Sequence, residues 1–181
     1  LEKALEKAEK ERQQKEEELK QALKELEQLK AQQQTVPVTL KKGETATVKG
    51  IVYRVTDADG REVEAYKAKK KNIKSVTVPK TVKIHGITCK VTAIADKAFS
   101  NSKKLSKAVI GANVTRIGKR AFYGDKNLKK IIIKSKKIRK AGTKALRGIS
   151  AKAVIQVPKG KKKAYTKLLK NRGQKKTVKI R

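Results

Sequence analysis

Apolar residues recur at regular intervals along the chain. The interval changes after residue 34 and divides the chain into two parts. In residues 1–34 the apolar positions alternate four- and three-residue steps, the heptad spacing that lets one seam of a helix meet a partner helix. The seam consists of Leu1, Leu5, Ala8, Arg12, Lys15, Leu19, Ala22, Leu26 and Leu29. Its middle is charged at Arg12 and Lys15. Pro37 ends the helix, because proline disfavours helical geometry in the residue before it.

A helix of this kind cannot bury its own seam and is marginal in isolation. We therefore expect a coiled-coil stalk, which would make the chain a homodimer through residues 1–34. Two other arrangements fit the same residues. One is a solvated single helix, since Glu, Lys and Gln are good helix formers. The other is a helix that lies on its own basic domain, with Glu16, Glu17 and Glu18 facing lysines.

A longer repeat organises the rest of the chain. Residues 91–99 recur as residues 114–122, 23 positions later, and a degraded copy at residues 138–146 follows after 24. Between the copies runs a second pattern, apolar-x-x-apolar-x-apolar. Its members are Ile73, Val76 and Val78; Leu105, Ala108 and Ile110; Leu128, Ile131 and Ile133; and Lys152, Ile155 and Val157. No single unit can bury its apolar residues, so we expect the units to stack.

Stacking predicts an α+β fold, a short solenoid with a parallel β-sheet. Val76, Ala108, Ile131 and Ile155 are expected to share one strand ladder, and Phe99, Phe122 and Leu146 a second inner column. The repeats are predicted over residues 73–157, with a hairpin insert at 81–91. Residues 35–72 are predicted to form an antiparallel β cap, and residues 158–181 a C-terminal cap of one helix and a last strand.

The repeat unit I-x-x-I-x-x-x-A-F-x-x-x-x-x-L-x-x-I-x-I resembles the BspA-like leucine-rich repeat family of bacterial cell-surface proteins. The resemblance covers about residues 73–181, and the segment after Gly148 resembles the terminal cap of Lys-rich members from Gram-positive bacteria. The third copy departs from the family pattern, with Leu146 in the place of Phe. The resemblance implies an extracellular or cell-surface location and a role in adhesion or protein binding. Repeats of this family carry no catalytic residues to transfer.

Charge narrows the choice of partners. The 181 residues hold 50 Lys and Arg against 16 Asp and Glu, a net charge of +34, and all of the excess lies after residue 34. Such a field concentrates acidic partners and weakens with salt. Lysines dominate and both phenylalanines are assigned to the core, so we expect nucleic acid to bind only nonspecifically, in vitro. Anionic glycans and cell-wall polymers are equally suitable partners.

Few residues could carry out chemistry. One His and one Cys exclude a zinc site of four His and Cys ligands, and extended chain separates His85 from Cys89 by too much for proton transfer. Asp96 and Asp125 occupy non-equivalent repeat positions, and turn formation explains Asp125. No segment approaches the roughly 18 apolar residues of a spanning helix, so no membrane insertion is expected. We expect no enzyme, no metal site and no cofactor.

The remaining candidate site is the outward row of the parallel sheet, where side chains alternate with the buried ladder. Lys107, Lys130 and Val154 are predicted to form one column and Val109, Ile132 and Gln156 the next, with Lys134 beside them. Exposed Val and Ile framed by Lys are typical of a contact surface. The alternatives are ordinary β propensity on a solvated face, or cover by a neighbouring element. A protein or an anionic glycan is the expected partner.

Overall fold

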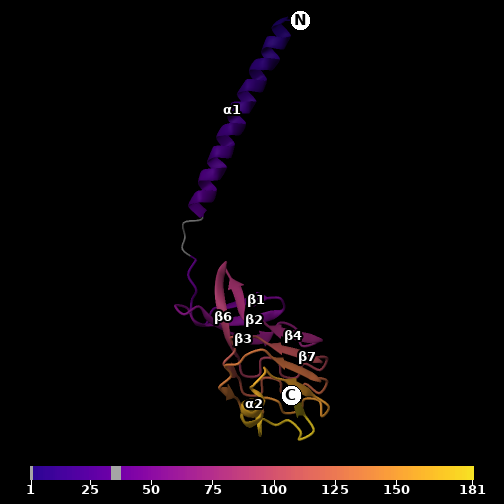
Figure 1. Ribbon diagram of the computed structural model, residues 1–181. Helices are drawn as coiled ribbons and strands as arrows, with labels where there is room; N and C mark the ends of the chain where they lie inside the picture. The colour runs from indigo at the N-terminus through magenta and orange to yellow at the C-terminus, as the bar shows by residue number, and fades with distance from the viewer. Residues whose placement is uncertain (1, 34–37) are drawn as a thin grey trace. The chain divides into compact units, whose positions relative to one another are not determined.

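The computed structural model describes residues 2–33 and 38–181 and divides into two compact units, residues 1–38 and 39–181 (Figure 1). The first unit contains one helix, α1 (Glu2–Gln33), in agreement with the heptad pattern. Every side chain of α1 that the structure describes is exposed. The seam residues Leu19, Leu26 and Leu29 are among them, at 49–63% exposure, so this part of the seam is available to a partner.

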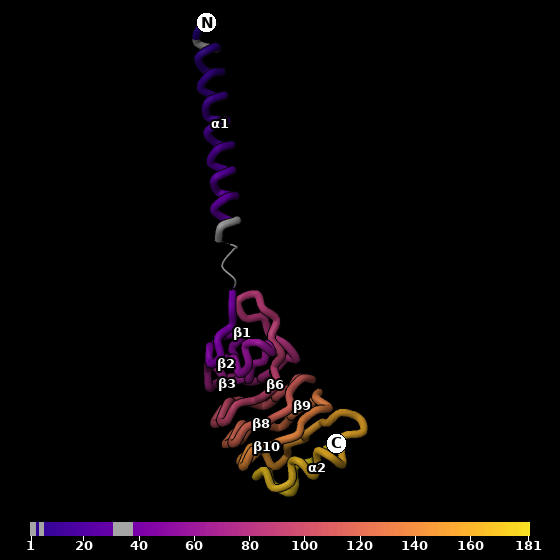
Figure 2. Tube along the Cα trace, turned by 90° about the vertical axis from the view of Figure 1, so that its left-hand side faces the viewer, coloured from indigo at the N-terminus to yellow at the C-terminus, as the bar shows by residue number. Residues whose placement is uncertain are grey.

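The second unit winds back and forth between two sheets (Figure 2). Its strands are β1 (Thr45–Val48), β2 (Ile51–Asp57), β3 (Glu62–Ala68), β4 (Ser75–Val78), β5 (Thr81–Ile84), β6 (Ile87–Ile94), β7 (Lys107–Ile110), β8 (Arg116–Ile117), β9 (Lys130–Ile133), β10 (Lys140–Ala141), β11 (Val154–Gln156) and β12 (Lys179–Ile180), and its helix is α2 (Lys162–Leu169). One sheet has seven strands in the order β1-β2-β3-β6-β8-β10, with β5 beside β6. The other has five strands in the order β12-β11-β9-β7-β4. Consecutive coils therefore add one strand to each sheet, which makes the fold a solenoid.

The five-stranded sheet is parallel at every pairing, as predicted. Val76 pairs with Ala108, Ala108 with Ile131, and Ile131 with Ile155. These four side chains are at most 4% exposed. The predicted ladder is confirmed in register, because apolar residues at alternate positions of each strand point into one continuous core.

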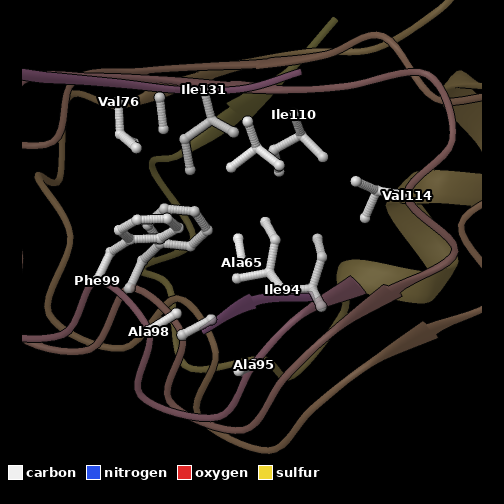
Figure 3. Packing of buried hydrophobic residues seen from close by; sticks show 14 of the residues in the cluster. Ala65, Val76, Ile94, Ala95, Ala98, Phe99, Ile110, Val114 and Ile131 are labelled. Atoms are coloured by element: carbon white, nitrogen blue, oxygen red, sulfur yellow. The ribbon is translucent and has the colours of Figure 1, made fainter. Parts of the chain in front are cut away.

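The second predicted column lies across the core from this ladder. Figure 3 shows Phe99 facing Val76 and Ile131 from the opposite wall. The rings of Phe99 and Phe122 are fully buried and stack with 5.5 Å between their centroids. The backbone N–H of Phe99 donates to the carbonyl oxygen of Ala121 at 2.9 Å, so the coils also hydrogen-bond where they carry no regular strand. Both phenylalanines therefore belong to one core, as predicted.

Small residues let neighbouring coils approach each other at the bend after β6, β8 and β10. Ala95, Gly118 and Gly142 occupy the same place in successive coils. A Cβ atom on Gly118 would lie 2.5 Å from the carbonyl carbon of Ala95. Gly142 stands in the same relation to the backbone of Gly118 and Lys119. The coil spacing at this bend therefore depends on glycine.

The N-terminal cap is antiparallel, as predicted, with β1 paired to β2 and β2 to β3. On its other side β3 pairs in parallel with β6, so parallel pairing begins upstream of residue 73. The buried side chain of Glu64 on β3 accepts hydrogen bonds from the guanidinium groups of Arg54 and Arg116. Arg116 also lies 3.6 Å from Asp96, so an ion-pair network ties the cap to the first coils.

Residues 81–94 contain the expected hairpin. Strands β5 and β6 pair antiparallel, with Ile84 opposite Ile87. The two turn residues, His85 and Gly86, both have positive φ angles, 48° and 80°. This is the geometry of a two-residue turn, which glycine at the second position favours.

The last coil is closed by the C-terminal segment. The side chains of Tyr165 and Leu169 on α2 are buried against it. The hydroxyl of Tyr165 donates to the carbonyl of Ser135 at 2.7 Å and accepts from the N–H of Ile138 at 3.1 Å. The N–H of Leu146 donates to the carbonyl of Arg172 at 2.9 Å, which replaces the coil that would otherwise follow. The predicted helix and last strand are therefore both present.

Candidate binding surface

The outward residues of the five-stranded sheet form the two predicted columns. Lys107 pairs with Lys130 and Lys130 with Val154, while Val109 pairs with Ile132 and Ile132 with Gln156. Lys134 continues the ladder beyond β9, and its N–H donates to the carbonyl of Ile110 at 2.9 Å. We call the residues Lys107, Val109, Lys130, Ile132, Lys134, Val154 and Gln156 the sheet face. The registration brings all seven onto one surface, because side chains of odd and even positions point to opposite sides of a strand.

The sheet face combines charge at its edge with apolar area between. The three lysines are exposed, and Val109, Ile132, Val154 and Gln156 are half-buried. Half-burial arises from neighbours within the sheet, because the Cα atoms of adjacent strands lie only about 5 Å apart. No acidic residue lies on any of the five strands. The surface therefore presents cations that have no counterion on their own sheet.

Three further residues continue the two columns. Ser75 and Thr77 on β4 pair with Lys107 and Val109, and Lys179 on β12 pairs with Val154. The positions on β4 follow from the repeat pattern, since Val76 and Val78 mark its buried positions. The position of Lys179 does not, because β12 lies outside the repeat and only its pairing with β11 sets the register.

The excess of positive charge lies after residue 64. Residues 35–64 contain five basic and five acidic residues, whereas residues 65–181 contain 37 Lys and Arg and two acids, Asp96 and Asp125. Asp96 is engaged, since one of its carboxylate oxygens accepts from the N–H of Lys119 at 2.7 Å. The repeats therefore carry an almost uncompensated positive field, which favours acidic partners.

Asp125 is a buried carboxylate of the coils. Its side chain is fully buried, and one oxygen accepts from the N–H of Ser102 in the preceding coil at 2.8 Å. The other oxygen has no hydrogen-bond partner among the described residues. Burial raises the pKa of Asp125 to about 7, although the Ser102 N–H and the charge of Lys71 oppose this. Besides its predicted place in a turn, Asp125 thus accepts a hydrogen bond that joins two coils.

His85 and Cys89 do not form a pair. His85 lies in the hairpin turn, where its Nε2 atom is 2.7 Å from a carboxylate oxygen of Glu44. The buried thiol of Cys89 donates to the carbonyl of Ile87, and burial raises its pKa. Within residues 2–33 and 38–181, no cluster of three His, Cys, Asp or Glu side chains could hold a metal ion. Over the same residues no helix has the length and hydropathy needed to cross a membrane.

Stacked coils, one strand of each in a parallel sheet, and inward ladders of aliphatic and phenylalanine residues define a leucine-rich repeat solenoid. This chain belongs to the BspA-type leucine-rich repeat family. The family model described as BspA type leucine rich repeat region, in six copies, matches residues 61–181. The match begins at the start of β3, where parallel pairing begins in the structure.

Two solved structures share this fold. One is a leucine rich cell surface protein from Faecalibacterium prausnitzii, 23% identical, with a TM-score of 0.52 over 66% of this chain and 38% of that one. The other is a leucine-rich repeat protein from Bacteroides capillosus, 17% identical, with a TM-score of 0.56 over 76% of this chain and 98% of that one. This chain thus spans well under half of the F. prausnitzii protein. No curated protein matches it.

Proposed function

We propose that the chain is a non-enzymatic binding module of a bacterial surface or secreted protein, and that the sheet face holds its partner. One observation carries the proposal: Lys107 and Lys130 are directly paired on an exposed sheet that has no acidic residue. Like charges in this position destabilise a sheet. An acidic partner would relieve this repulsion, so the arrangement is better suited to a complex than to the free protein.

The partner we propose is a protein with an acidic surface or an anionic glycan, including a cell-wall polymer. Val109, Ile132 and Val154 supply apolar area between the lysines, as in the centre of a protein interface. Lys107, Lys130 and Lys134 supply the charges that steer an acidic molecule towards that area. Support for a location outside the cell comes from family membership and from the cell-surface description of the F. prausnitzii protein.

Heparin is a suitable probe for this face, since it is a strongly anionic glycan. The test variant carries Lys107→Glu, Lys130→Glu and Lys134→Glu. The control carries Lys69→Glu, Lys83→Glu and Lys90→Glu, which change the net charge equally on exposed residues outside the five-stranded sheet. We expect the face variant to lose about tenfold more affinity for immobilised heparin than the control. Equal losses would contradict the proposal.

Generic polyanion binding is a second candidate, favoured by the 37 basic residues between positions 65 and 181. It predicts that DNA and heparin bind alike, with a steep dependence of log affinity on log salt that neither triple variant changes selectively. The sheet face predicts a modest salt slope, because apolar contact does not depend on counterion release.

We further propose that α1 pairs two copies of the chain through the seam that includes Leu19, Ala22, Leu26 and Leu29. The exposure of the three leucines supports this, because an apolar seam at heptad spacing is stabilised by burial in a second helix. Pairing would present two solenoids together, and two weak sites on one dimer bind a polymer or a surface with higher avidity.

A further inference from the structure

A hollow lies at the corner of the coils that precedes β7 and β9. Its volume is about 670 Å³, within the range of small-molecule sites. Lys103, Tyr123, Lys126, Asn127 and Arg147 line it, together with the column described next. We call it the corner groove. None of the sheet-face residues lines it.

A column of left-handed residues forms the floor of the corner groove. Asn101, Gly124 and Gly148 follow one another in successive coils, with φ angles of 58°, 78° and 82°. A Cβ atom on Gly124 would collide with the side-chain oxygen of Asn101, and one on Gly148 would lie 3.2 Å from Gly124. Because two of the three positions are glycine, no side chain from them fills the hollow.

Hydrogen bonds between coils keep the groove in shape. The N–H of Asn101 donates to the carbonyl of Tyr123 at 2.7 Å, and the N–H of Gly124 to that of Arg147 at 2.8 Å. The side-chain amide of Asn127 donates to the carbonyl of Lys103 at 2.7 Å. These bonds tie three coils together, so the groove is formed before any ligand arrives and a ligand loses less affinity to the cost of ordering it.

The lining combines three kinds of chemistry. The half-buried Tyr123 offers a ring surface, and the exposed amides of Asn101 and Asn127 offer donors and acceptors. Lys103, Lys126 and Arg147 are exposed cations, and no carboxylate lines the hollow. Sugars use these groups: the C–H face of a pyranose packs on an aromatic ring, and its hydroxyls pair with amides.

Tyr123 also borders a smaller hollow, lined by Lys97 and Arg120 among others. The guanidinium of Arg120 lies over the Tyr123 ring, 5.4 Å from its centroid. The Nε atom of Arg120 is buried and has no hydrogen-bond partner within the described part of the chain. An aromatic ring held next to several cations is suited to a ligand that is part sugar ring and part anion.

We propose that the corner groove binds a sugar that carries an acidic group, with its ring on Tyr123 and its anion near Arg147. The site is separate from the sheet face and does not require it. Acidic sugars occur both in host glycans, with sulfate and carboxylate groups, and in bacterial or plant polymers, with carboxylate alone. The shared chemistry is a pyranose ring bearing a negative charge.

The test is isothermal titration of the full chain with four tetramers. Tetragalacturonate carries carboxylates, a heparin tetrasaccharide carries sulfates and carboxylates, maltotetraose is neutral, and tetrathymidylate is a nucleic acid. We expect at least one acidic sugar to bind about tenfold or more tightly than maltotetraose, and the tighter of the two identifies the source. Tetrathymidylate should bind more weakly than that sugar.

The variants separate the groove from the general field. Tyr123→Ala and Arg147→Gln should each weaken the acidic sugar by about tenfold, while Tyr123→Phe should retain the ring contact and most of the affinity. Lys83→Gln with Lys90→Gln, which remove two exposed charges on the β5–β6 hairpin, should change it by less than about twofold.

Three results would overturn the corner groove. They are no binding of either acidic sugar, equal loss from the hairpin control, or tighter binding of tetrathymidylate with the same dependence on Tyr123. The first and third results would not affect the proposal for the sheet face, because that proposal is tested with polymeric heparin and with variants at other residues.

Discussion

The rings of Phe99 and Phe122 stack at a centroid distance of 5.5 Å with 22° between their planes. The residues are 23 positions apart, one repeat, and neither ring has any exposed surface. Contact between equivalent side chains of consecutive repeats is the defining property of a solenoid. Pairs such as this one therefore stabilise the packing of each coil on the next.

Phe122→Ala should lower the free energy of unfolding by about 3–5 kcal/mol, because it removes a buried ring and leaves a cavity between two coils. Phe122→Leu is the matched control, since Leu146 occupies the same position one coil later, and it should cost clearly less. Urea unfolding followed by tyrosine fluorescence measures both, because all four tyrosines lie in residues 39–181. Similar losses for the two variants would show that the column is not closely packed.

Gly118→Ala should destabilise the coils by about 1–3 kcal/mol, a typical cost of overpacking. The added Cβ atom would meet the backbone of Ala95, which cannot move without separating two coils. Lys119→Ala, at the exposed neighbouring position, is the control and should be nearly neutral. Thermal unfolding of both variants tests the account, and an unchanged midpoint for Gly118→Ala would refute the close approach.

Asp125 should make the coils less stable as the pH rises. Its pKa is raised by burial to about 7 from about 4 in the unfolded chain, so between these values only the folded state binds the proton. The resulting stability is complete below pH 4 and is lost as the pH rises through 7, by at most about 4 kcal/mol.

Asp125→Asn should remove this loss while keeping an oxygen for the N–H of Ser102. The informative quantity is the difference between the wild-type and variant stability curves at pH 5 and pH 8, because that difference cancels the contribution of every group the two proteins share. Asp96→Asn, at an exposed position, is the control. A wild-type curve parallel to that of Asp125→Asn would disprove the buried proton.

The helix α1 should make the full chain dimeric at micromolar concentration in sedimentation experiments. Leu19→Glu with Leu26→Glu should give monomers, because both positions lie on the seam. Gln21→Glu with Gln28→Glu adds the same charge off the seam and should leave the dimer intact. A wild-type chain that sediments only as a monomer would rule out the proposed pairing.

The sequence predicts the ladders well because two periods coincide. Alternation along each strand marks the buried positions, and the recurring apolar-x-x-apolar-x-apolar pattern marks which of them touch, so Val76, Ala108 and Ile131 are paired correctly even though the hairpin insert lengthens the first step to 32 residues. The same alternation and the 23-residue spacing of Lys107 and Lys130 are sufficient to predict that every sheet-face residue lies on one surface.

Features that depend on single long-range contacts escape this reasoning. No repeat in the sequence predicts the parallel pairing of β3 with β6. The hydrogen bond between Ser102 and Asp125 depends on how deeply one turn is buried. The corner groove arises because Asn101, Gly124 and Gly148 share a left-handed backbone, which spacing alone does not reveal. Such details follow from coil geometry and not from hydrophobic periodicity.

Binding through the sheet face is the central functional claim, and lysine footprinting tests it most directly. The full chain is acetylated with and without a heparin octasaccharide, and the modification of each lysine is measured by mass spectrometry. Lys107, Lys130 and Lys134 should be protected severalfold more than Lys83 and Lys90. These two lysines are also exposed, but they lie on the β5–β6 hairpin. Uniform protection of all five lysines would contradict the claim and leave only the overall charge as the attraction.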